Sequence, residues 1–147
     1  MNDYPSWWDT TVTLYNKYTS SDGEITWFRH VIPNTFYKLV REKLTVGDTT
    51  LITNESVCRI RISDDFMPPI QWKALSESEK SQYFTLRAGD IIVGEETDFE
   101  INEYAKGSRS SDLKDIYKDW PGCFTVEIAS VNVGGGRGEE HYLARGM

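Results

Sequence analysis

The sequence predicts a mainly β domain, a small antiparallel β-barrel or sandwich with one amphipathic α-helix near 110–120. Three observations predict this fold class. Apolar and polar residues alternate with a period of two over several short runs, turn clusters separate these runs, and one segment alone has convincing helical spacing. The 147 residues suffice for a single domain, 1–147, and its 5 Trp, 8 Tyr and 6 Phe are enough for a sizeable core.

A β-hairpin is predicted near the beginning of the chain. In Thr11–Lys17 the apolar residues Val12 and Leu14 share one face of an expected strand, and Glu24–Ile32 is the expected partner strand. The turn cluster Ser20–Gly23 lies between them and contains the Asp-Gly pair that is typical of tight hairpin turns.

The next region gives a less uniform signal. Phe36–Leu44 fits a strand or a helix, and Gly47-Asp48 interrupts it. Val57–Ile62 is a clear strand, in which Arg59 and Arg61 lie on the face opposite to the apolar residues.

An irregular insertion is expected at about 64–88. Pro68-Pro69 can neither donate to a β-ladder nor continue a helix, and Ser76–Glu79 fits a capping box that precedes only a short polar turn. Arg87–Asp90 is predicted to be a turn, and Ile91–Val93 a short buried strand.

The helix is predicted from an apolar stripe at positions i, i+3, i+4 and i+7. Ser110 or Ser111 can cap its start, and Pro121-Gly122 ends it. The stripe consists of Leu113, Ile116, Tyr117 and Trp120.

Two further strands are expected after this helix. Cys123–Val133 alternates with a change of phase near Ala129-Ser130 that indicates a bulge, and His141–Arg145 follows. The intervening loop 134–138 is rich in glycine, but a strand follows it and it lacks the Gly-Lys-Ser/Thr of a phosphate-binding loop. We therefore interpret it as a flexible hairpin tip.

Composition excludes several classes of protein. The 23 Asp and Glu outnumber the 16 Lys and Arg, and the net charge of −7 argues against non-specific binding of nucleic acid. No apolar run is long enough to span a bilayer, and the first residues do not resemble a signal peptide.

The residues with reactive side chains form no recognisable constellation. Cys58 and Cys123 lack metal-ligand spacing and are expected to be reduced and buried, and His30 and His141 are expected to be packed or surface residues. We therefore predict no catalytic site, no cofactor and no metal.

Aromatic and charged clusters are the candidates for an interaction surface. Adjacent Trp7 and Trp8, within the segment 1–9, must either clamp the chain end onto its own domain or reach a partner. Arg59 and Arg61 suit a solvated sheet face, a subunit contact or phosphate contacts. The remaining acidic candidates, which suit a solvated face or a basic partner, are Glu95, Glu96 and Asp98.

Two further segments are candidates for extensions that become ordered on a neighbouring subunit or plug a channel. One is the glycine-rich loop with Arg137. The other is segment 64–72, with Phe66, Met67 and Trp72.

Four stretches of the chain resemble small proteins of tailed bacteriophages and prophages of Gram-positive bacteria. In size and β-rich pattern the chain is similar to head-closure (stopper) and head–tail connector proteins, small barrels that assemble as rings below the portal. The pattern consists of strands and turns and contains no active-site signature. The stretches are Ser6–Lys17, Gly89–Gly94, Ser110–Leu113 and Gly138–Leu143.

This resemblance implies a virion structural protein without enzymatic activity. Its expected partners are further copies of itself, the portal or adaptor protein and tail proteins, with transient passage of viral DNA and no membrane. Its expected place is the head–tail junction, after assembly in the host cytoplasm. Two alternatives remain open: a tail terminator or tail completion protein, and a small phage-encoded inhibitor of a host protein.

Overall fold

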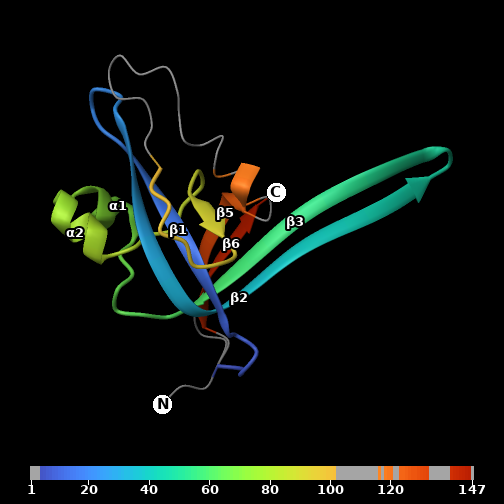
Figure 1. Cartoon of the computed structure of the whole chain (residues 1–147), viewed down its shortest axis with the longest axis horizontal. Helices are drawn as coiled ribbons and strands as arrows, with labels where there is room; N and C mark the ends of the chain where they lie inside the picture. The colour runs from blue at the N-terminus through green and yellow to red at the C-terminus, as the bar shows by residue number, and fades with distance from the viewer. Residues whose placement is uncertain (1–3, 102–115, 117, 121–122, 133–139, 147) are drawn as a thin grey trace.

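The computed structural model describes residues 4–101, 116, 118–120, 123–132 and 140–146, and it confirms the mainly β fold class (Figure 1). Six antiparallel strands close a barrel in the order β1-β2-β3-β6-β5-β4. The strands are β1 (Thr10–Thr19), β2 (Ile25–Val46), β3 (Thr49–Arg61), β4 (Ile91–Val93), β5 (Phe124–Asn132) and β6 (His141–Gly146).

The predicted first hairpin is confirmed. β1 pairs with β2 from Thr19↔Ile25 back to Thr10↔Thr35. Gly23 has φ 87°, a left-handed conformation that glycine adopts without steric cost, and this turn reverses the chain.

The ambiguous run Phe36–Leu44 is entirely strand. β2 pairs with β1 through Thr35 and with β3 from Phe36 onward, and Asn34 has φ 57° next to this change of partner. The two-residue loop at Gly47 and Asp48 then joins β2 to β3.

The outer part of the β2–β3 hairpin projects far from the barrel (Figure 1). β3 pairs with β6 only over Ser56–Arg61, so residues 40–46 and 49–55 pair only with each other among the residues that the structure describes. We call residues 40–55 the arm. Two short strands joined by a tight turn would have given a compact barrel, whereas here one long hairpin supplies both a barrel wall and a protrusion.

Segment 64–88 is more regular than the sequence indicated. It contains two short helices, α1 (Pro69–Lys73) and α2 (Glu77–Gln82). The expectation that the stretch around Pro68-Pro69 is irregular was wrong from Pro69 onward, because proline is tolerated at the first position of a helix, where its missing N–H is not required. The capping box is confirmed, since the Ser76 side chain accepts a hydrogen bond from the Glu79 N–H (3.3 Å).

The predicted helix near 110–120 falls mostly outside the described residues. Within it, Ile116, Lys118 and Asp119 are helical, and the Trp120 N–H donates to the Ile116 carbonyl oxygen (3.0 Å). β5 and β6 form the expected pair, and the glycine-rich stretch predicted as a hairpin tip between them lies outside the described residues. The bulge in β5 lies between Val126 and Ile128, slightly before the predicted position.

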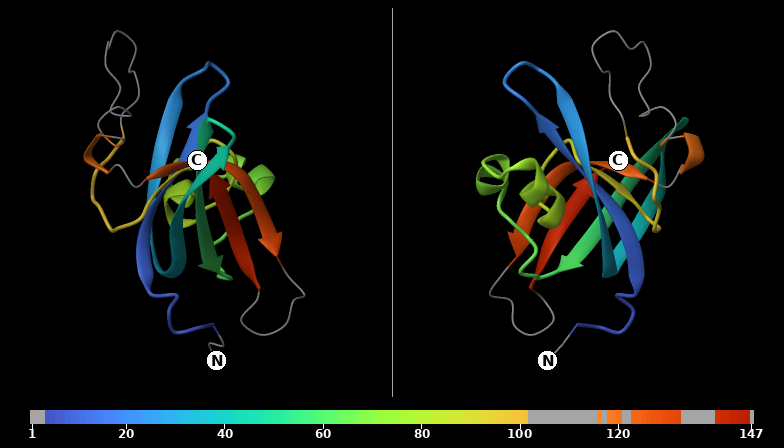
Figure 2. Two further views of the ribbon diagram at one scale, coloured as in Figure 1. Left: turned by 90° about the vertical axis from the view of Figure 1, so that its right-hand side faces the viewer. Right: turned by 60° about the vertical axis from the view of Figure 1, so that its left-hand side comes forward.

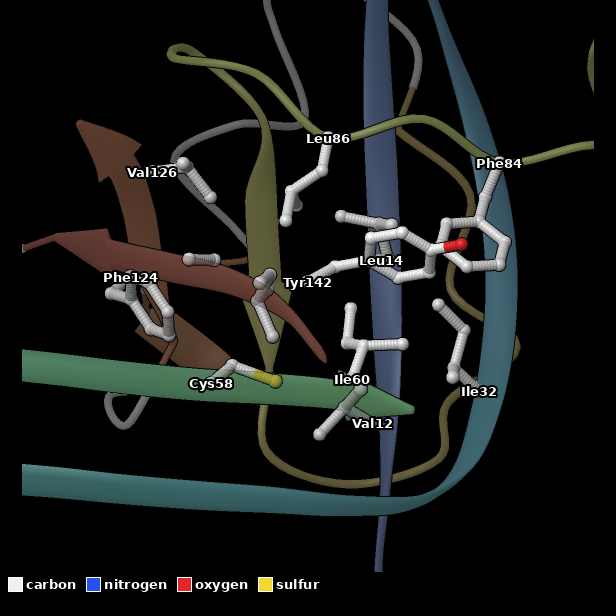
Figure 3. Packing of buried hydrophobic residues seen from close by; sticks show 12 residues of the cluster. Val12, Leu14, Ile32, Cys58, Ile60, Phe84, Leu86, Phe124, Val126 and Tyr142 are labelled. Carbon is white, nitrogen blue, oxygen red and sulfur yellow. The ribbon is translucent and has the colours of Figure 1, made fainter. Parts of the chain in front are cut away.

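The barrel interior forms the main hydrophobic core (Figure 3). Val12 and Leu14 of β1 point into it, as the alternation predicted. The opposite face of β1 is buried as well, because Tyr15 belongs to a second cluster with Trp27 and Ile101. Figure 2 shows the chain after β4 running along the outside of the barrel, and this covering layer is the reason that one strand is buried on both faces.

β4 closes the barrel although it has only three residues. It pairs with β1 through Thr13↔Val93 to Tyr15↔Ile91, and with β5 through two residues. The turn before β4 adds two bonds to β5: the Gly89 N–H donates to the Val126 carbonyl oxygen (2.8 Å), and the Val126 N–H donates to the Asp90 carbonyl oxygen (2.7 Å).

A buried polar contact, which we call the Asn16–Asp90 latch, holds this turn against β1. The Asn16 amide donates to the Asp90 carboxylate (2.9 Å) and to the Thr85 carbonyl oxygen (2.7 Å), and its oxygen accepts from the Thr85 N–H (3.1 Å). The Asp90 carboxylate also accepts the backbone N–H groups of Lys17 and Arg87, each at 3.0 Å. Both side chains are fully buried, so these bonds replace those that water would otherwise make.

We expect Asn16→Ala to lower the free energy of unfolding by about 3 kcal/mol, since it leaves buried partners unsatisfied. Urea denaturation measures the change. Asn132→Ala is the matched control: Asn132 is exposed and its side-chain amide contacts the His141 ring at the surface (3.0 Å), so the loss should stay within about 0.5 kcal/mol. Equal effects of the two substitutions would contradict a central role for the latch.

Candidate functional site

A groove of about 540 Å³ lies between β2 and α2. Residues 29–34 of β2 form one wall, and Ser81 and Gln82 of α2 belong to the opposite wall. Asp65 and Phe84 also line it. The groove therefore has both polar and apolar lining residues.

The wall of the groove formed by β2 is a free sheet edge. Residues 29–32 pair with β1 along one edge, and β3 joins β2 only from Phe36. Within the described ranges no strand covers the other edge. Unpaired N–H and C=O groups along a strand edge favour the addition of a further strand.

His30 lies in this wall and is nine-tenths buried. Its Nε2 atom has no hydrogen-bond partner among the residues described. Burial, with a contribution from neighbouring Arg29, lowers the pKa of His30 to about 4, so the ring is neutral at pH 7. The prediction of a packed histidine is therefore confirmed, but its unsatisfied nitrogen is unusual for a core residue.

The two adjacent tryptophans have separate environments. Trp8 is 5% exposed and packs against Tyr4, Phe36 and His141, whereas Trp7 is 66% exposed. The sequence left open whether they clamp the chain end or face a partner. Trp8 clamps the chain end, and Trp7 has a large apolar surface in solvent.

The two predicted arginines contact their own chain. Arg61 donates from Nε to the Asn34 carbonyl oxygen (2.9 Å) and from Nη2 to the Trp8 carbonyl oxygen (3.0 Å). Arg59 is exposed, and its guanidinium lies 5.3 Å from the centre of the Phe36 ring. Arg61 therefore positions the N-terminal segment and the bend of β2, and Arg59 retains an accessible charge.

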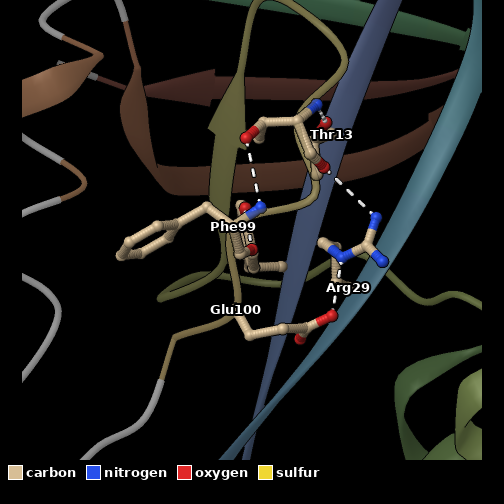
Figure 4. A network of polar contacts seen from close by, with 6 residues as sticks. Thr13, Arg29, Phe99 and Glu100 are labelled. Atoms are coloured by element: carbon tan, nitrogen blue, oxygen red, sulfur yellow. Dashed lines mark hydrogen bonds and ion pairs between the residues drawn. The ribbon is translucent and has the colours of Figure 1, made fainter.

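The segment that contains Glu95, Glu96 and Asp98 follows β4 along the outside of β1 and β2, and hydrogen bonds hold its backbone there (Figure 4). The Thr13 hydroxyl donates to the Glu95 carbonyl oxygen (2.8 Å) and accepts from the Thr97 N–H (3.0 Å). Arg29 donates to the Glu100 carboxylate (2.8 Å) and to the Thr97 carbonyl oxygen (3.2 Å). We call residues 94–101 the strap.

The strap leaves its predicted acidic side chains in solvent. Glu95, Glu96 and Asp98 are exposed, and Glu100 is partly neutralised by Arg29. Among the described residues, the ion pairs join Arg29 to Glu100 and Arg145 to Glu55. Neither Arg59 nor Arg61 therefore forms an ion pair with Glu95, Glu96 or Asp98. The two charged surfaces remain separate.

Of the candidate residues in segment 64–72, Trp72 is buried and Phe66 and Met67 are partly buried, whereas Ile70 of the same segment is 85% exposed. Trp72 is fully buried, packs edge-on against Phe28 and donates from Nε1 to the Tyr83 carbonyl oxygen (2.8 Å). Phe66 stacks on Tyr142 with ring centres 4.0 Å apart, and the Met67 N–H donates to the Phe84 carbonyl oxygen (2.8 Å). Trp72 has no surface for a partner, and the segment covers its own barrel.

The remaining predictions concern reactive groups. Burial raises the pKa of Cys58 to about 12 and that of Cys123 to about 11, so both thiols are protonated at pH 7. In the part of the chain that the structure describes, no group of three or more His, Cys, Asp or Glu residues is arranged to hold a metal, and no helix is long and apolar enough to cross a membrane. Arg137 lies outside the described residues.

Sequence reasoning missed the arm and the groove. Gly47-Asp48 between runs rich in Thr, Val and Leu was a usable hairpin signal, since glycine at the first position suits a two-residue hairpin loop. The groove had no comparable signal, because it depends on where β2 changes partner and on where α2 lies.

Residues 7–147 match a family described as a family of unknown function (DUF6751). No curated protein and no solved structure matches the chain.

Two buried groups should affect the pH dependence of stability in opposite directions. Burial raises the pKa of Asp90 from 3.8 to about 6 and lowers that of His30 from 6.5 to about 4. As the pH rises between these values, Asp90 loses its proton first in the unfolded chain, so its contribution to stability falls. His30 binds its proton more tightly in the unfolded chain, so its contribution rises with pH.

In Asp90→Asn the contribution of His30 remains, so we expect the free energy of unfolding to rise by about 3 kcal/mol between about pH 4 and pH 6.5. In His30→Gln the contribution of Asp90 remains, so we expect the free energy of unfolding to fall by about 3 kcal/mol over this range. Urea denaturation across this pH range measures both slopes. Parallel curves for the two variants and the unchanged chain would contradict these assignments.

The thiols should be unreactive in the folded protein. With Ellman's reagent at pH 8 we expect no rapid labelling of Cys58 and only slow labelling of half-buried Cys123, and rapid labelling of both in guanidinium chloride. Cys58→Ala and Cys123→Ala assign the two signals. Rapid labelling of Cys58 without denaturant would contradict its burial.

Proposed function

The chain belongs to the DUF6751 family, and we propose that it is a structural subunit of a bacteriophage virion, a head-closure or connector protein that forms a ring at the head–tail junction. In this role it links the portal or adaptor protein to the tail and surrounds the path of the viral DNA. The proposal combines the resemblance of its sequence stretches to phage structural proteins with the shape of the molecule.

The arm is the observation that carries this proposal. Residues 40–46 and 49–55 form a two-stranded ribbon that pairs with no other described strand. A two-stranded hairpin is at best marginally stable in water by itself. A protrusion of this kind is typical of a protein whose function is to contact other subunits.

The base of the arm supports the same interpretation. Leu39 is 51% exposed there, next to the last pairing between β3 and β6 at Ser56. Trp7 is a second large exposed apolar side chain. Aromatic and aliphatic groups of this size are common at the centres of protein–protein contacts.

The charge of the chain is compatible with a conduit for DNA. A net charge of −7 per subunit disfavours adhesion to phosphates, and the strap keeps Glu95, Glu96 and Asp98 in solvent. A ring of such subunits would let DNA pass without binding it specifically.

The native mass of the chain tests the proposal. We expect light scattering to show assembly that grows with concentration or on addition of portal rings. A variant in which Asn-Gly replaces residues 40–55 should remain folded, because this change keeps the β3–β6 pairs, and should lose at least tenfold in assembly.

Val131→Lys is a control variant that should assemble normally, since Val131 is an exposed residue on β5, outside the arm and the groove. A chain that stays monomeric at all concentrations and ignores portal and tail proteins would overturn the proposal. In that case capture of a host protein would favour the inhibitor alternative.

A further inference from the structure

We propose that the arm of one copy docks in the groove of a neighbouring copy and adds a strand to the free edge of its β2. This inference rests on the proposed function, because it names the partner of the arm within a ring. The occupant is a second copy of this chain, and the bonds that join the copies are main-chain hydrogen bonds between strands.

The groove offers the receiving edge. Residues 29–34 of β2 border it, and the four that pair with β1, residues 29–32, have a second edge that no described strand covers. Four residues of strand extend for about 13 Å, which is long enough for a short paired strand. Ile32, Ile60 and Phe84 supply an apolar lining next to this edge.

The arm offers the donating edge. From Ser56 towards the turn, β3 has no further β6 residue beside it, and beyond Thr35 the only described strand that β2 pairs with is β3. Each strand of the arm therefore has one edge without a partner among the described strands. Pairing one of these edges converts a ribbon of two strands into a sheet of three or more, which is the number that usually gives a stable sheet.

The arrangement of the molecule excludes pairing within one copy. The arm leaves the barrel on one side, and α1 and α2 lie on the opposite side (Figure 1). Ser81 and Gln82 of α2 line the groove, so the arm points away from the groove of its own chain. Two different surfaces on opposite sides give a head-to-tail contact, and repeated head-to-tail contacts close into rings when the rotation permits.

The polar groups in the groove favour a polypeptide strand over an anionic ligand. Arg29 is already paired with Glu100, Arg61 is bonded to two carbonyl oxygens, and Asp65 adds a negative charge. His30 is neutral and has a buried nitrogen without a partner. A neutral donor or acceptor from an incoming strand satisfies such a group, whereas a phosphate would meet no free cation of Arg29 or Arg61.

An experiment in which two variants of the whole chain are mixed tests the inference. The first variant has Asn-Gly in place of residues 40–55, so it has a groove and no arm. The second is Val31→Lys, which has an arm and a lysine at the free edge of β2, where Val31 is 39% exposed and lines the groove. A lysine at a strand edge opposes strand addition.

Each variant alone should assemble at least tenfold more weakly than the unchanged chain, under conditions in which that chain assembles. Mixed in equal amounts, the two should form a dimer that grows no further, since only one productive contact remains. Val131→Lys is the matched control, because it places the same charge at an exposed β-strand valine away from the groove, and it should assemble normally.

Ser81→Trp is the second groove variant, in case Val31→Lys does not fold. It fills the groove from an exposed position on α2 and should replace Val31→Lys in the mixture with the same result. Far-ultraviolet circular dichroism and urea denaturation establish that each variant is folded.

The outcomes separate this inference from the proposed function. If the unchanged chain assembles but the mixture gives no dimer, or if Val31→Lys assembles normally, the arm binds elsewhere and the inference is overturned while the proposed function stands. If the unchanged chain binds portal rings without contacts between its copies, the inference is also overturned. If it neither assembles nor binds portal or tail proteins, both fail.

Discussion

The Asn16–Asp90 latch is the contact on which the closed barrel depends. β4 has three residues and pairs with β5 through only two, so its own ladder bonds are few. The latch adds five hydrogen bonds within the interior, where competing water is excluded and an unmade bond is costly. It brings the turn before β4 against β1, and the same turn reaches β5 at Val126. Without this turn the sheet would be open between β1 and β5.

Closure at β4 determines how the other side of the barrel is built. Because β1 meets β4 along one edge, β2 lies on its other edge and is long enough to change partner at Phe36 and continue beyond the barrel. This change of partner has two consequences. It leaves residues 29–32 of β2 with a free edge, and it directs residues 40–55 away from the barrel as the arm. The free edge and the arm are therefore products of a single bend, next to which Asn34 has its positive φ.

Much of the aromatic surface stabilises the chain itself. Trp72 and Phe66 come from one segment that the sequence marked as a possible contact and Trp8 from another, and each packs on neighbours within the same molecule. Arg61 and Arg29 similarly use their guanidinium groups to hold loop backbones. The groups that remain accessible to partners are unpaired strand edges and isolated exposed apolar side chains, such as Trp7 and Leu39. A protein of this kind is suited to contacts made by strand pairing more than by a large apolar patch.

The sequence by itself determined the local elements. Alternation in Thr11–Lys17 and Val57–Ile62, the Asp-Gly turn before Glu24 and the capping box at Ser76 each depend on neighbouring residues, and each was correctly predicted. The first helical position of Pro69 was also a local signal, and it was overlooked. Only the tertiary structure decided which faces are buried, because Tyr15 becomes interior only when the strap covers β1. The pairing of Asn16 with Asp90, the separation of Trp7 from Trp8, and the free edge beside His30 likewise depend on residues distant in the chain. Periodicity records one strand at a time, whereas the choice of partner strand depends on how all six close into one barrel.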